Sequence, residues 1–205
     1  MKPQRGVPPP EPVGIPFRFP HPEPPRGGKA GQVLPVFLPY AGCPERCIFC
    51  NQPAQTGQAP EPLASIYERL QERLASLSGL EANSSAPQRA ASAQASPELA
   101  FYGGTFTALP APWPQRFLEL AQPHLSAGRL SRVRCSTRPD AVFVPQLAEL
   151  RTLGLSLVEL GVQSFDDGAL AASRRGYTGA QARRGCEAVR EAGLSLGVQL
   201  MASSS

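Results

Sequence analysis

Three cysteines in one short loop restrict this 205-residue chain more than any other feature. Cys43, Cys47 and Cys50 follow a short apolar run with the spacing C-x3-C-x2-C. Thiolates this close together are typical ligands of a soft metal centre. Closed zinc sites and most all-cysteine clusters use four protein ligands, one more than this loop supplies. A [4Fe–4S] cluster held by three cysteines leaves one iron open to another ligand.

Two other interpretations fit the same cysteine pattern. The first is a disulfide with one spare thiol, which is disfavoured because the sequence shows no secretion signal. The second is a zinc site completed by His21 or His124. The remaining cysteines, Cys135 and Cys186, lie far from the triplet, and we expect both to be small buried side chains.

The composition predicts a globular, soluble protein, and with no secretion signal in the sequence we expect a cytoplasmic one. The chain is 41% hydrophobic and 18% charged, with a net charge of +4. No apolar run approaches the ~18 residues of a membrane span, so we expect no membrane contact. Residues 1–31 hold ten of the 24 prolines and are predicted to form a disordered leader. We expect residues 32–205 to form the core domain, with a flexible insertion at 81–98 that is rich in Ala, Ser and Gln.

Strand and helix patterns alternate along the core. Strands are predicted at 33–37, 99–102, 132–136, 157–161 and 196–200, and helices at 62–77, 114–122, 145–153 and 179–192. This alternation predicts an α/β fold around a parallel sheet, with successive strands as neighbours. Such folds place their chemistry at the carboxyl ends of the strands. Because the sequence stops just after the fifth strand, we expect a domain truncated there.

The alternation of side chains within the strands predicts two different sheet faces. Along residues 157–163, a carboxylate and an amide share one face, and three aliphatic residues share the other. The first set is Leu157, Glu159, Gly161 and Gln163, and the second is Val158, Leu160 and Val162. We expect helices to cover the apolar face and a ligand cavity to lie on the polar one. An open antiparallel sheet with its polar face in water is the alternative.

Four further motifs follow the predicted strands. They are FYGGTFT at 101–107, STRPD at 136–140, ELGVQSF at 159–165 and RRGYT at 174–178. Together with the cysteine loop and QLM at 199–201, they resemble the radical S-adenosylmethionine (SAM) superfamily, and within it the Elongator protein 3-like branch. The resemblance covers about residues 33–201. It implies a partial (β/α)6 TIM-type barrel, truncated after about the fifth strand.

The same resemblance implies a [4Fe–4S] cluster and SAM as cofactors. Cys43, Cys47 and Cys50 would bind three irons, and the fourth iron would bind SAM. Seven further residues would contact SAM. They are Phe49 beside the adenine, Gly104 and Thr105 at the methionine end, Ser136 and Gln163 at the ribose or amino group, Arg175 at the carboxylate, and Gln199 at the adenosyl group. Glu159 is interpreted as a structural or substrate-side carboxylate.

The function implied is formation of a 5′-deoxyadenosyl radical that abstracts hydrogen from a substrate. Relatives in this branch act on the wobble uridine of tRNA, so tRNA is the leading substrate hypothesis, with flavodoxin or ferredoxin as the reductant. The compact C-x3-C spacing also resembles the oxygen-independent coproporphyrinogen oxidases, which makes a small-molecule substrate the alternative. A Pro-Gly-Leu-Pro-Gly segment expected after QLM is replaced by Ala-Ser-Ser-Ser. A zinc-binding module and an inactive fragment therefore stay open.

Overall fold

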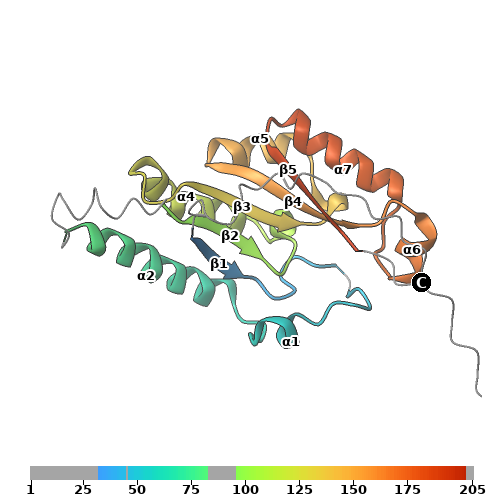
Figure 1. Ribbon diagram of the computed structural model, residues 1–205, viewed down its shortest axis with the longest axis horizontal. Helices are drawn as coiled ribbons and strands as arrows, with labels where there is room; N and C mark the ends of the chain where they lie inside the picture. The colour runs from blue at the N-terminus through green and yellow to red at the C-terminus, as the bar shows by residue number, and fades with distance from the viewer. Residues whose placement is uncertain (1–31, 45, 83–95, 202–205) are drawn as a thin grey trace, which may run out of the picture. The chain divides into compact units, whose positions relative to one another are not determined.

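One parallel sheet organises the chain (Figure 1), in a computed structural model that describes residues 32–44, 46–82 and 96–201. Its strands are β1 (Val33–Phe37), β2 (Glu98–Tyr102), β3 (Arg132–Thr137), β4 (Leu155–Gln163) and β5 (Ser195–Leu200). Each strand pairs in parallel with the next, in the order β1-β2-β3-β4-β5. The predicted α/β fold with sequential neighbours is confirmed, and it is consistent with part of a TIM-type barrel.

Helices connect the strands. The long ones are α2 (Leu63–Ala82), α4 (Trp113–Ser126), α5 (Val144–Thr152) and α7 (Gly179–Glu191), and the short ones are α1 (Gln52–Thr56) and α6 (Asp167–Ala172). Two 3-10 turns, η1 (Phe106–Ala108) and η2 (Pro139–Ala141), follow β2 and β3. The long helices contact one another in chain order. No helix among the described residues is long and apolar enough to cross a bilayer.

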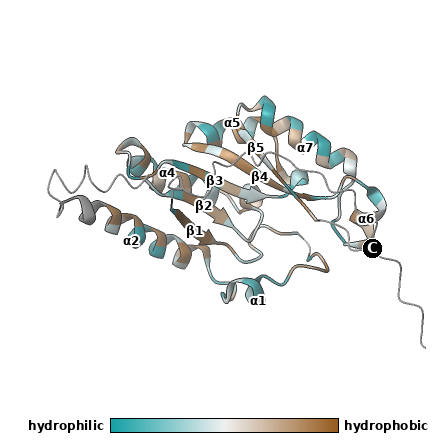
Figure 2. Cartoon of the chain, viewed as in Figure 1, coloured by the Kyte–Doolittle hydropathy of each residue, from teal (hydrophilic) through white to brown (hydrophobic). Residues whose placement is uncertain are grey.

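The core lies between these helices and one face of the sheet. Val158, Leu160 and Val162 of β4 are fully buried, while the residues between them are only partly buried. They belong to one cluster with side chains from all four long helices, among them Leu70, Phe117, Leu147 and Val189. Figure 2 shows this division, with largely hydrophobic strands and helices that carry both colours. The predicted apolar and polar faces of β4 are therefore confirmed.

The apolar side chains at the end of the last strand are exposed. The exposed fractions of Val198 and Leu200 are 41% and 61%. The preceding helix α7 covers only the beginning of β5, where Leu196 packs against the core. Among the described residues no strand pairs with the outer edge of β5. The apolar face of this strand therefore remains largely exposed.

Element bounds differ from the predictions mainly at the ends. The helix predicted at 62–77 continues to Ala82, and the strand predicted at 157–161 runs from Leu155 to Gln163. The short helices α1 and α6 were not predicted, because five or six residues are too few to show a helical period. The leader, most of the insertion at 81–98 and residues 202–205 lie outside the described residues.

Candidate cofactor site at the carboxyl ends of the strands

A cavity of about 270 Å³ lies where the strands end. This is close to the lower end of the roughly 300–1,000 Å³ typical of small-molecule sites. All ten residues that the sequence predicted for the site line it: Cys43, Cys47, Phe49, Cys50, Gly104, Thr105, Ser136, Gln163, Arg175 and Gln199. They come from the loops after β1 and β2, from the ends of β3 and β4, from the segment after α6, and from β5. The fold thus brings together residues that are up to 156 positions apart in the sequence.

The three cysteine side chains each meet a different neighbour. The Sγ of Cys43 lies 3.3 Å from Thr105 Oγ1, Arg175 Nη1 donates to Cys47 Sγ at 3.0 Å, and Gln52 Nε2 donates to Cys50 Sγ at 3.4 Å. Burial raises the pKa of the Cys43 thiol, and the Thr105 hydrogen bond and the charge of Arg138 offset part of this rise. A bound metal would therefore have to displace a proton from Cys43.

The three thiol groups are not arranged as in a site that binds a single metal ion. Within the described ranges, no three or more His, Cys, Asp or Glu side chains are placed to hold one metal ion. A [4Fe–4S] cluster does not need the three thiolates to reach one metal ion, because each cysteine binds a different iron. His124, the zinc ligand considered from the sequence, lies in a separate groove, where it accepts a hydrogen bond from Arg129. The donor set therefore fits a three-cysteine cluster.

Tyr40 and Gln52 brace the cysteine loop. Gln52 Oε1 accepts a hydrogen bond from the Tyr40 amide at 2.6 Å, and the Tyr40 hydroxyl donates to the Cys50 carbonyl at 3.3 Å. The Gln52 amide in turn donates to the Tyr40 hydroxyl at 3.0 Å. Tyr40 adopts a left-handed backbone conformation, with φ of 58°. Sequence reasoning missed both residues, and their only signal was that they flank the cysteines.

The glycine pair after β2 packs directly against the cysteine loop. A Cβ atom on Gly104 would lie 2.3 Å from the Ala41 carbonyl oxygen and 2.7 Å from that of Leu38. The next residue, Thr105, donates its amide to the same Ala41 oxygen at 2.8 Å. The sequence interpretation explained Gly104 by the approach of SAM. In the structure, the contact between two backbone turns already requires a glycine here.

This contact predicts a large effect of Gly104→Ala on stability. Because backbone atoms must move, we expect the free energy of unfolding to fall by about 3 kcal/mol. The corresponding loss in Tm is roughly 6–12 °C, measurable by circular dichroism. Gly128→Ala is the control, since a Cβ there meets nothing within 4 Å and the cost, from its φ of 70°, should be about 1 kcal/mol. Equal melting temperatures for the two variants would refute the argument.

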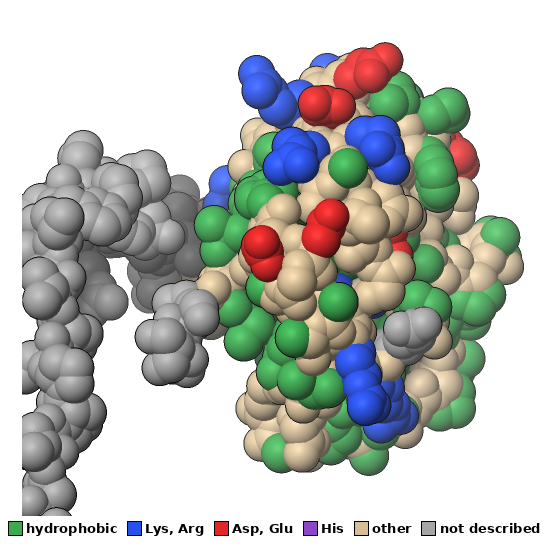
Figure 3. All heavy atoms as spheres, turned by 90° about the vertical axis from the view of Figure 1, so that its right-hand side faces the viewer, with side chains coloured by type: hydrophobic (Ala, Val, Ile, Leu, Met, Phe, Trp, Pro, Cys, Tyr) green, Lys and Arg blue, Asp and Glu red, His purple; other side chains and the backbone are tan. Residues whose placement is uncertain are grey.

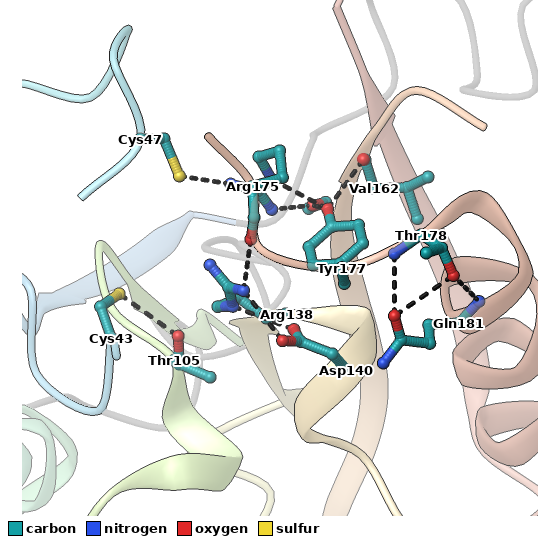
Figure 4. A network of polar contacts seen from close by, with 11 residues as sticks. Cys43, Cys47, Thr105, Arg138, Asp140, Val162, Arg175, Tyr177, Thr178 and Gln181 are labelled. Atoms are coloured by element: carbon teal, nitrogen blue, oxygen red, sulfur yellow. Dashed lines mark hydrogen bonds and ion pairs between the residues drawn. The ribbon is translucent and has the colours of Figure 1, made fainter. Parts of the chain in front are cut away.

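Arg175 is buried at the centre of a polar network (Figure 4). Besides Cys47 Sγ, it donates through Nε to the Tyr177 hydroxyl at 2.9 Å and through Nη2 to the Gly161 carbonyl. The Tyr177 hydroxyl is also 2.8 Å from the Gly161 and Val162 carbonyls. A guanidinium has five N–H groups, so two of them remain for a ligand in the cavity.

Ser136 connects the cavity to charged residues on the polar face of the sheet. Its hydroxyl donates to Glu159 Oε2 at 3.2 Å, and Arg134 Nη1 donates to Glu159 Oε1 at 2.5 Å. Arg134 also pairs with Glu98 on β2 and donates to the Tyr102 hydroxyl. The carboxylate of Glu159 therefore holds the Ser136 hydroxyl in place, and the oxygen lone pairs of that hydroxyl stay available to the cavity.

Known proteins resemble this chain in sequence profile and in fold. The sequence profile of the family described as the radical SAM superfamily matches residues 37–202. Elp3 of the archaeon Methanocaldococcus infernus, solved with an N-terminal deletion, is 19% identical with a TM-score of 0.52, over 83% of this chain and 38% of that one. The cobalamin-dependent SAM radical enzyme OxsB, solved with aqua-cobalamin and SAM bound, is 15% identical with a TM-score of 0.54, over 82% of this chain and 24% of that one.

At these identities the likeness concerns the fold. The chain spans less than two-fifths of the length of either solved protein. No curated protein sequence matches the chain.

Proposed function

Because the chain belongs to the radical SAM superfamily, whose enzymes use a [4Fe–4S] cluster and SAM, we propose that it forms a 5′-deoxyadenosyl radical from SAM. One observation carries the proposal. The three cysteines and all seven residues proposed to contact SAM line a single cavity at the carboxyl ends of the strands. Such an edge is where parallel α/β folds bind their cofactors.

We assign each of these residues a contact with the cluster or with SAM. Cys43, Cys47 and Cys50 hold the cluster, which when bound supplies the electron that cleaves SAM into methionine and the radical. Arg175 directs its two remaining N–H groups at the SAM carboxylate. Ser136 and Gln163 bind the ribose or amino group. The remaining contacts of the proposal are Gly104 and Thr105 at the methionine end, Phe49 beside the adenine, and Gln199 at the adenosyl group.

The test is release of 5′-deoxyadenosine. The chain is reconstituted with iron and sulfide without oxygen, then incubated with SAM and dithionite, and the product is measured by chromatography. We expect release from the wild type and only background from Cys47→Ala. Equal release from both proteins, or none from a wild type that carries its cluster, would remove the assignment.

We also infer that the substrate is tRNA, as the motif resemblance to the Elongator protein 3-like branch implies. Two exposed arginines support this inference, Arg46 in the cavity lining and Arg183 on α7. Arg46 lies over the Tyr40 ring at 3.9 Å, and Arg183 lies over the partly exposed Phe165 ring at 6.0 Å. Paired arginines and aromatic rings suit the phosphates and unstacked bases of an RNA loop. Figure 3 shows the carboxyl-end side of the molecule, with blue arginines in an upper and a lower group.

Binding of tRNA can be measured by filter retention at several salt concentrations. We expect affinity to fall steeply with salt, and Arg183→Gln to weaken binding several-fold with a smaller salt slope. Arg190→Gln, at the other end of the same helix, should change little. Salt-independent binding, or none, would instead favour a small-molecule substrate. The remaining parts of the proposal are a cytoplasmic location and a flavodoxin or ferredoxin as reductant.

A further inference from the structure

We propose that Arg138 donates a hydrogen bond and a positive charge to the sulfur atoms around the cluster, and so makes the cluster easier to reduce. The inference rests on the proposed function, because it assumes a cluster on Cys43, Cys47 and Cys50. Arg138 belongs to the motif STRPD at 136–140, for which neither the residue pattern nor the family resemblance gave a role to the arginine.

One nitrogen of Arg138 has no hydrogen-bond partner among the residues that the structure describes. The side chain is 5% exposed and lines the cavity, yet its Nη1 is a buried atom without a hydrogen bond. A buried N–H of this kind costs stability unless a ligand accepts from it. In Figure 4 the guanidinium of Arg138 lies on the side of the network that faces Cys43 and Cys47. A ligand in the cavity is therefore the natural acceptor for this nitrogen.

The rest of the side chain is fixed rigidly. Nε and Nη2 bind the two carboxylate oxygens of Asp140 at 2.9 and 2.8 Å, and Nη2 also donates to the Arg175 carbonyl at 2.6 Å. These contacts hold the guanidinium in one orientation. They also tie η2, where Asp140 lies, to the segment that carries Arg175. The other two nitrogens donate all three of these hydrogen bonds, which leaves Nη1 for a further acceptor.

The charge of Arg138 lies beside the proposed cluster site. Its side chain lines the same cavity as Cys43 and Cys47. A cluster on three thiolates gains one negative charge when it accepts an electron. A fixed cation and an N–H donor at its sulfur atoms stabilise that added charge, and hydrogen bonds to the sulfurs are a known control of cluster potentials. Arg138 should therefore raise the reduction potential.

The experiment compares cluster midpoint potentials by dithionite titration, followed by electron paramagnetic resonance, in the reconstituted full chain. We expect Arg138→Gln to shift the one-electron equilibrium at least tenfold toward the oxidised cluster, which is a potential lower by about 59 mV. Arg138→Lys keeps the positive charge, so its midpoint potential should lie close to that of the wild type. Arg132→Gln, at the opposite end of β3, is the matched control and should leave the potential unchanged.

Iron content and thermal melting separate this role from a structural one. If Arg138→Gln does not fold, the Arg138→Gln/Asp140→Asn double variant leaves no partly buried carboxylate unpaired. Its potential should also lie below that of the wild type, by a smaller amount because a negative charge is removed as well. Equal potentials in wild type and a folded Arg138 variant that carries its cluster would overturn the inference and leave the proposed function standing. A wild type that forms no cluster would overturn both.

Discussion

Cys50→Ala is expected to leave the chain colourless after anaerobic reconstitution with iron and sulfide. The wild type should take up about four irons and turn brown, because three thiolates are the least that hold a four-iron cluster here. Removing one of them leaves two irons without a protein ligand, so we expect iron content to fall to well under half. Iron and sulfide assays with visible absorbance measure this.

The matched control is Cys186→Ala, the same chemical change on helix α7. Cys186 packs beside the core, outside the cavity lining, and should leave iron uptake unchanged. Cys50 is only half-buried, so its truncation should cost little stability, and melting curves will check this. Iron content equal in both variants would show that the triplet does not hold the metal. One zinc per wild-type chain would point to the zinc-binding alternative.

Arg175→Ala is expected to weaken SAM binding about 100-fold, which is about 2.7 kcal/mol of binding free energy. The guanidinium is pinned by Cys47, Gly161 and Tyr177, so its remaining donors are oriented before the ligand arrives. A carboxylate loses a planar, two-pronged and charged partner when this side chain is removed. Calorimetric titration of SAM into the reconstituted chain measures the loss.

The neighbouring arginine provides the control for this prediction. Arg174 is exposed and does not line the cavity, so Arg174→Ala should bind SAM as the wild type does. Iron content must be measured in both variants, because Arg175 also contacts Cys47 Sγ. If Arg175→Ala keeps its cluster and its SAM affinity, the proposed carboxylate contact is wrong.

The alternation of strands and helices predicted the sheet, and the resemblance to the radical SAM superfamily supplied the residues that line the cavity. In a parallel sheet, every carboxyl end lies at the same edge, so motifs that follow strands must meet. That rule explains why residues as distant as Cys43 and Gln199, which the resemblance assigned to one site, line the same cavity. Strand alternation likewise separated buried Val158 from Glu159 on the polar face.

Contacts that depend on backbone conformation could not be predicted from the sequence. The brace between Tyr40 and Gln52 needs a left-handed Tyr40, which nothing in its residue type indicates. Gly104 was predicted for its proximity to SAM, whereas a contact between two loops distant in sequence decides its identity.

The most direct test of a cluster with one iron free for SAM is electron paramagnetic resonance of the dithionite-reduced wild type, recorded with and without SAM. We predict a cluster signal whose g-values change when SAM is added, because SAM then binds the iron that lacks a cysteine. A cluster signal that SAM leaves unaltered, or a reduced protein with no cluster signal, would contradict this account.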